Sequence, residues 1–310
     1  MPTINLSPLG VSGGIPGGNG GQHGERQKIN GWSLQSARGN TRFLRSVVVD
    51  QLPEYGLAFT FTVRDLPTPQ QWSRLKKQIV RALTERYGCV CWHMVTEWTK
   101  AGRPHLHGCA FWFEFEMHYH RLGNAWLHYS AEFGTLNRGQ LIKQIDGADG
   151  WFIYMAKHAA RGLGHYQRQA DAMPPEWRSQ TGRVWSQGGR WPTKTEVNEV
   201  TLAEFYRFRR MIDRVARAEA KAGLNRALRY GDKNNAAALR KRLIFLRKLR
   251  KAFGGGSKAS ATRGINQWVS GEVSGKLLRW SIEHEVRPGT SDSIEASLEA
   301  HGLSSVEVPF

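Results

Sequence analysis

Acidic residues, cysteines and long apolar runs are all scarce in this chain of 310 residues. Asp and Glu number 26 against 44 Lys and Arg, and the resulting net charge of +18 favours a polyanionic partner. Three cysteines are too few for a disulfide framework and favour a reducing compartment. No apolar run approaches the ~20 residues that cross a bilayer, and the opening residues lack the basic start and apolar block of a secretory signal. We therefore expect a basic cytoplasmic protein without a membrane partner.

Apolar residues are nevertheless plentiful, since 40% of the chain is hydrophobic and 12 residues are Trp. Disordered chains lack the apolar surface that offsets chain entropy, so this composition excludes wholesale disorder. The length allows one or two domains.

Composition divides the chain into four regions. Residues 1–37 include a segment at 10–24 that is more than half glycine, which predicts a flexible arm. A phosphate-binding loop would need a helix start and a Lys-Ser/Thr pair, and both are missing. Residues 38–192 alternate between strand and helix patterns and predict the main domain. A basic helical region is expected at 193–253, followed at 254–310 by a linker and a tail to which we assign no function.

Hydrophobic periodicity predicts the elements of the main domain. Alternating apolar and β-branched residues indicate strands, and apolar residues at helical spacing indicate helices. The expected order is a strand at 57–63, a helix at 70–87, strands at 90–98 and 105–115, a helix at 119–133, a short strand at 141–146 and a helix at 150–161. Six residues separate the second and third strands, so these two form an antiparallel hairpin. The order predicts an α+β fold, an antiparallel central sheet with helices packed on one side.

His105 and His107 give the sharpest chemical signal, inside the segment Arg103-Pro-His-Leu-His-Gly108. Residues i and i+2 of a strand face the same side, so the two imidazoles are presented together. Glu97 lies across the short turn at 101–104 and offers a carboxylate at a similar height. Two imidazoles and one carboxylate suit Mg²⁺, Mn²⁺ or Zn²⁺. The alternative is that the two histidines only form surface hydrogen bonds.

Tyr154 and Lys157 are three residues apart on the expected helix at 150–161 and share one helical face. A tyrosine hydroxyl, whose ordinary pKa is about 10, is a poor nucleophile unless a cation or metal is close. Lys157 can supply that charge or contact a phosphate under attack. The alternative is an amphipathic core helix whose Tyr and Lys keep only their polar ends in solvent.

Taken in order, these motifs resemble the HUH (His-hydrophobic-His) endonucleases, specifically the rolling-circle replication initiators of filamentous phages and small plasmids. Phe59-Thr-Phe-Thr62 looks like the first strand motif, and Glu97 with His105-Leu-His107 resembles the metal motif and its upstream acidic ligand. Tyr154-Met-Ala-Lys157 resembles the tyrosine motif, Tyr-x-x-Lys. The segment at 182–192 is similar to one that often follows in phage initiators. The resemblance covers residues 40–192 and implies an RRM-like palm.

The resemblance implies a site-specific endonuclease that nicks and joins one DNA strand. Glu97, His105 and His107 would hold Mg²⁺ or Mn²⁺ as the metal cofactor. Tyr154 would attack the phosphate and become a 5′-phosphotyrosine, and Lys157 would offset charge there. The expected partners are single-stranded or supercoiled origin DNA and the helicase and polymerase of a bacterial host.

One position departs from the pattern of some relatives, which carry a second tyrosine four positions after the first. His158 stands there, so we expect one nucleophile, and termination would then involve a second subunit in a possible dimer.

Other interpretations of the same residues stay open. The protein could be a non-catalytic nucleic-acid-binding module on the same sheet, or a relaxase or transposase of the same superfamily. Cys89, Cys91 and Cys109 lie near the histidines and offer a rival zinc site, although buried free thiols are more common. The arginine-rich run at 201–252 is either a solvated charged face or a contact for the DNA backbone, and the scarcity of acidic partners favours DNA.

Overall fold

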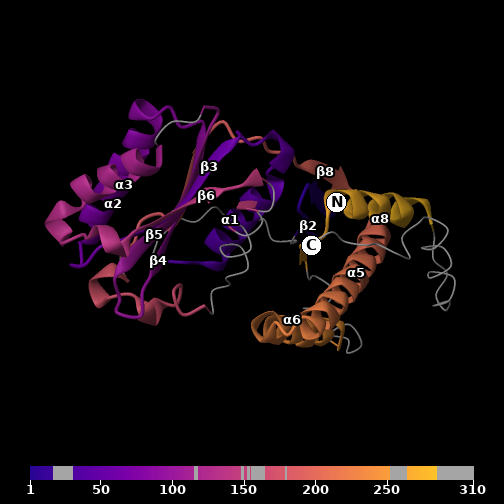
Figure 1. Cartoon of the computed structure of the whole chain (residues 1–310). Coiled ribbons are helices and arrows are strands. Elements are labelled where there is room, and N and C mark those ends of the chain that lie inside the picture. The colour runs from indigo at the N-terminus through magenta and orange to yellow at the C-terminus, as the bar shows by residue number, and fades with distance from the viewer. Residues whose placement is uncertain are drawn as a thin grey trace. The chain divides into compact units, whose positions relative to one another are not determined.

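The structure, a computed structural model, describes residues 1–16, 31–114, 118–147, 150–151, 154, 165–178, 180–251 and 264–284. The chain forms two compact units (Figure 1). Residues 21–193 make up one, here called the middle unit, and residues 1–20 with 194–310 make up the other, called the terminal unit. Within the described ranges, no helix combines the length and apolar character needed to cross a membrane.

The middle unit is built on a five-stranded sheet in the order β6-β3-β5-β4-β7, in which every pair is antiparallel. Its strands are β3 Tyr55–Thr62, β4 Cys91–Trp98, β5 Pro104–Trp112, β6 Leu141–Ile145 and β7 Trp185–Gly189. Its helices are α1 Leu34–Ser46, α2 Pro69–Arg81 and α3 His118–Tyr129. The expected α+β fold with an antiparallel sheet is confirmed.

Local sequence explains where several of these elements begin and end. Thr68 caps α2 and exchanges hydrogen bonds with Gln71 in a capping box, with Pro69 in the first helical position. A π-helical turn at Ala82–Arg86 ends this helix. Short 3₁₀ turns occur at Val49–Gln51, Ala131–Phe133, Asn137–Gly139, Ala170–Ala172 and Pro175–Trp177.

One face of the sheet forms the main hydrophobic core with α2 and α3. Phe61 of β3 stacks on Trp126 of α3, with ring centroids 4.9 Å apart, and Trp72 of α2 meets Trp126 edge to face. Leu106 of β5 is fully buried in the same cluster. Burial of these large side chains is what fixes the strand register, because a shift by one residue would turn them to the other face.

The other face of the sheet carries α1, opposite α2 and α3 (Figure 1). Phe43 of α1 stacks on His93 of β4 at 5.5 Å and meets Trp191 edge to face. The expectation that helices pack on one side of the sheet is therefore wrong for α1. Its segment has few apolar residues and three arginines, so the helical pattern is weak in the sequence.

The terminal unit has its own four-stranded sheet in the order β8-β1-β2-β9. The strands are β1 Thr3–Ser7, β2 Gly10–Gly14, β8 Glu196–Glu199 and β9 Ile265–Gln267, and the helices are α5 Leu202–Arg229, α6 Lys233–Lys251 and α8 Gly271–Glu283. Ile4, Val11, Phe205 and Leu277 are among the residues of its core. Helices α5 and α6 occupy the region that the sequence predicts to be basic and helical.

The first 37 residues differ from the expected flexible arm. Residues 3–14 form the hairpin of β1 and β2, and α1 begins at Leu34 with Ser33 as its N-cap. Gly13 of β2 allows the two strands to approach closely, because a Cβ at this position would lie only 2.6 Å from the carbonyl oxygen of Thr3. Residues 17–30 and 252–263 lie outside the described residues, and the second range includes the expected linker at 254–260.

Candidate metal and tyrosine site

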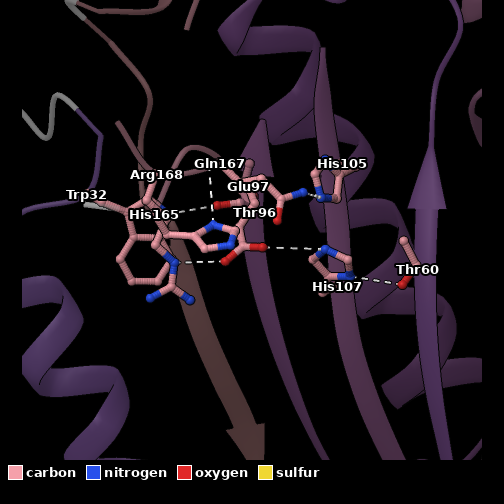
Figure 2. A network of polar contacts seen from close by, with 9 residues as sticks. All are labelled: Trp32, Thr60, Thr96, Glu97, His105, His107, His165, Gln167 and Arg168. Atoms are coloured by element: carbon pink, nitrogen blue, oxygen red, sulfur yellow. Dashed lines mark hydrogen bonds and ion pairs between the residues drawn. The ribbon is translucent and has the colours of Figure 1, made fainter. Parts of the chain in front are cut away.

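Glu97, His105 and His107 come together on the sheet face that carries α1 (Figure 2). Glu97 of β4 pairs directly with His105 of β5, and Val95 pairs with His107. Alternation along the strands puts all three polar side chains on one face. Their exposed fractions are 0%, 3% and 4%, so the cluster is buried. The structure thus joins the three residues that the sequence proposed as metal ligands.

The ligand atoms of these residues all lie within 4.8 Å of one another, and His107 Nε2 is 3.5 Å from Glu97 Oε2. Atoms bound at ~2.1 Å to one ion lie roughly 3 to 4 Å apart, so only a small contraction would complete a site. Two imidazoles and a carboxylate are a donor set that divalent metals accept. Among the described residues, this buried group could bind a metal ion.

Thr60 orients the second histidine. Its Oγ1 lies 2.8 Å from His107 Nδ1, across the pairing of β3 with β5. When Nδ1–H donates to this hydroxyl, the lone pair on Nε2 faces Glu97, which is the tautomer a metal ligand needs. Gln167 Nε2 contacts the first histidine in the opposite direction: its amide N–H donates to His105 Nε2 at 3.2 Å, so that ring nitrogen is the acceptor.

Arg168 holds the other oxygen of Glu97. Its Nε donates to Glu97 Oε1 at 2.7 Å, and the guanidinium lies 3.9 Å from the centre of the Trp32 ring (Figure 2). Both side chains of the ion pair are buried, at 1% and 0% exposed. The arrangement leaves Oε2 directed at His107, so the carboxylate is oriented before any ion arrives.

Tyr154 lies on the same sheet face, beside a different pair of strand residues. Its hydroxyl is 2.8 Å from His93 Nδ1, and His93 pairs with Cys109, the next position on this face after His107. Burial raises the pKa of Tyr154 well above its ordinary value, with smaller contributions from Cys109 and Glu97. Two residues along a strand span ~6.6 Å, so the backbone of the His93–Cys109 pair is offset from that of the Val95–His107 pair by about that length.

Part of the predicted tyrosine motif lies outside the residues that the structure describes. Gly150, Trp151 and Tyr154 are helical as expected, whereas Lys157 and His158 lie outside the described residues. The cysteines do not join the Glu97 cluster, and burial raises the pKa of Cys91 to about 12, which keeps that thiol protonated.

Five polar residues around this cluster were not predicted from the sequence: Asn40, Thr60, His93, Gln167 and Arg168. His93 had a signal, because it precedes Glu97 by four residues on a strand and must face the same side. Thr60 falls within the first motif that the sequence singled out, but that motif gave it no role. Asn40 and Arg168 come from segments with no pattern that points to the site.

Comparison with known proteins gives relatives among replication proteins. Two Xylella fastidiosa proteins that bear the name replication protein are 44% and 41% identical to the chain over 195 and 200 residues, which is 62% and 64% of this chain and 68% and 75% of theirs. Replication-associated protein G2P of Pseudomonas phage Pf3 is 37% identical over 204 residues, covering 64% of this chain and 73% of its own. No family model matches the chain. No solved structure matches it either.

Fold and site together define an α+β protein with a buried, metal-compatible cluster on an antiparallel sheet. The chain belongs to the family of replication proteins that includes Replication-associated protein G2P of phage Pf3.

Proposed function

We propose that this protein initiates rolling-circle DNA replication by nicking and rejoining one DNA strand, as an HUH endonuclease. The observation that carries the proposal is the cross-strand cluster of Glu97, His105 and His107 with Tyr154 on the same sheet face. The names of the relatives support a role in replication. The net charge of +18 suits a DNA substrate.

The metal ligands and the tyrosine have separate tasks in this proposal. Glu97, His105 and His107 would hold Mg²⁺ or Mn²⁺, and a bound divalent ion would polarise the scissile phosphate. Tyr154 forms a bond to phosphorus while the bond from phosphorus to the 3′-oxygen breaks. The 5′ end then stays on the enzyme as a phosphotyrosine, and the free 3′-hydroxyl primes synthesis. Because one ester replaces another, the strand can be rejoined later.

Lys157, the basic helices and other proteins also take part in the proposed reaction. Lys157 offsets charge on the phosphate. Helices α5 and α6 contact the DNA backbone, and a host helicase and polymerase extend the free 3′ end. A second copy of the chain supplies the second tyrosine at termination.

Tyr154 is only 5% exposed and its hydroxyl contacts His93, so DNA must displace part of what covers this face. Trp151 and Trp191 pack against each other there, with ring centroids 5.7 Å apart. The buried resting state of the tyrosine also suits the alternative, a protein that binds DNA without cutting it.

A denaturing gel tests the proposal. The protein is incubated with single-stranded and supercoiled DNA of its own replicon, with Mn²⁺, Mg²⁺ or EDTA. We expect a covalent protein–DNA adduct with either metal, none in EDTA, and none from Tyr154→Phe or from His107→Ala.

Retained DNA binding by both variants would show that chemistry alone was lost. A folded wild type that binds this DNA but forms no adduct in either metal would favour the non-catalytic binder.

A further inference from the structure

Three side chains from three different elements form a continuous hydrogen-bonded line on the buried sheet face. Tyr154 Oη lies 2.8 Å from His93 Nδ1, and His93 Nε2 lies 2.6 Å from Asn40 Oδ1. His93 and Asn40 are both 0% exposed. The ring of His93 is also stacked on Phe43, which fixes its plane. An imidazole between a hydroxyl and an oriented amide is the arrangement that activates hydroxyl nucleophiles.

The direction of the hydrogen bonds follows from the donors available. Asn40 Oδ1 can only accept, so His93 Nε2 carries the proton and donates to it. Nδ1 of the neutral ring is then an acceptor, and the hydroxyl of Tyr154 donates to it. Burial, with a further effect of Arg168, lowers the pKa of His93 to about 3, so the ring is neutral at physiological pH.

We propose that His93 is the proton acceptor for Tyr154 in strand cleavage, and that Asn40 is the positioning residue that holds His93 in the required tautomer. This role rests on the proposed nicking activity. The sequence motifs at Glu97, His105 and Tyr154 include neither His93 nor Asn40.

The step balances in atoms and charge. As Tyr154 Oη bonds to phosphorus, its proton moves to His93 Nδ1, and the bond from phosphorus to the 3′-oxygen breaks. The departing 3′-oxygen takes up one proton, either directly from the imidazolium or from solvent while the imidazolium releases its proton to solvent. Rejoining runs the same transfers in reverse.

The position of the line suits this chemistry. His93 and Cys109 form the strand pair next to Val95 and His107, at an offset of ~6.6 Å along the strands. A phosphate held at the Glu97 cluster can therefore face the tyrosine from the adjacent position.

Three titratable or charged groups face this line from the surrounding elements: the thiol of Cys109 from β5, the carboxylate of Glu97 from β4 and the guanidinium of Arg168. Burial raises the pKa of Cys109, so its thiol stays protonated and does not compete as a base.

The test measures single-turnover adduct formation on an oligonucleotide that spans the cleavage site mapped with the wild type, in Mn²⁺, from pH 6 to 9. His93→Gln should slow the reaction by on the order of 100-fold at pH 7, because general base catalysis contributes about that much or more. The wild-type rate should be nearly flat with pH. The His93→Gln rate should rise about tenfold per pH unit, because the reaction then needs an ionised phenol. A fluorinated tyrosine at 154, whose phenol is more acidic, should restore part of the rate.

Asn40→Ala should show a smaller loss with the same pH rescue, and it keeps the proposal testable if His93→Gln does not fold. His118→Gln is the matched control, since His118 is a buried histidine stacked on Trp112 of the other face. It should react like the wild type.

Each outcome has a distinct meaning. Folded His93→Gln that reacts at the wild-type rate, or that is inactive without any rescue by pH or fluorotyrosine, overturns the proton-acceptor role. Absence of an adduct with the wild type itself instead contradicts the nicking function. Melting curves and Mn²⁺ binding of each variant separate these results from misfolding.

Discussion

The buried ion pair of Arg168 and Glu97 should stabilise the protein. We expect the effect of breaking it to depend on whether a metal ion is bound. A buried carboxylate that loses its partner costs roughly 3 to 5 kcal/mol. Arg168→Met should therefore lower the free energy of unfolding by about that amount in EDTA. Added Mn²⁺ should recover more stability in the variant than in the wild type, because the ion then neutralises Glu97. Urea denaturation with and without Mn²⁺ measures both effects.

Arg81→Met is the matched control, because the contact of Arg81 with Glu85 is 3.7 Å long and both side chains are largely exposed. Exposed pairs contribute at most about 1 kcal/mol. A loss in Arg168→Met no larger than in Arg81→Met would contradict the importance of the buried pair.

The hairpin of β4 and β5 carries all three proposed metal ligands, and its register depends on a close contact to β3. Gly108 pairs with Phe59, and a Cβ on Gly108 would lie 2.2 Å from the Phe59 ring. Gly108→Val should therefore destabilise the protein by about 1 to 3 kcal/mol through overpacking. It should also weaken Mn²⁺ binding, because His107 neighbours Gly108 on the same strand. Thermal melts and Mn²⁺ titration measure the two effects.

Gly123→Ala is the control for adding a methyl group in the same unit. Gly123 lies in α3, and a Cβ there would make an ordinary contact of 3.5 Å with Ile142. Helix propensity should make this variant equal to or up to about 1 kcal/mol more stable than the wild type. Equal melting temperatures for Gly108→Val and the wild type would contradict the close contact between Gly108 and the Phe59 ring.

The cluster of Glu97, His105 and His107 could be predicted from sequence because the three residues are close in sequence and belong to one hairpin. Period-2 alternation and a short turn suffice to bring Glu97, His105 and His107 to one face. The same rule places His93 there. Arg168 and Asn40 could not be predicted, since long-range packing brings them in and neither segment has a periodic signal.

Strands β7 and β2 could not be predicted from the sequence either. β7 is rich in glycine and joins the sheet as an edge strand only through its pairing with β4. In the terminal unit, β1 lies between β2, which ends at Gly14, and β8, which begins only at Glu196, so its two partners are far apart in the sequence. The glycine content of β2 is typical of a linker, and only its partners make it a strand.

At the level of the whole molecule, charge predicts how DNA affinity depends on salt. Helix α6 exposes Arg240, Lys241 and Arg247, and Leu246 packs it against α5. If these cations contact phosphates, replacing all three with Gln should reduce the slope of log affinity against log salt by about 2 to 3. Fluorescence anisotropy with a labelled single-stranded or duplex oligonucleotide at several salt concentrations measures the slope.

Lys276→Gln provides the control, because the ammonium of Lys276 is 2.8 Å from Glu272 on α8. Its slope should equal that of the wild type. An unchanged slope in the triple variant would mean that α6 is a solvated charged face, the other interpretation of its sequence.

The most direct test of the account is the identity of the residue that becomes linked to DNA. The adduct formed in Mn²⁺ is digested with nuclease and trypsin, and the nucleotide-bearing peptide is sequenced by mass spectrometry. We predict a nucleotide joined through its 5′-phosphate to Tyr154. Attachment to another residue, such as the exposed Tyr166, would contradict it and would move the reacting group away from the sheet face that carries Glu97, His105 and His107.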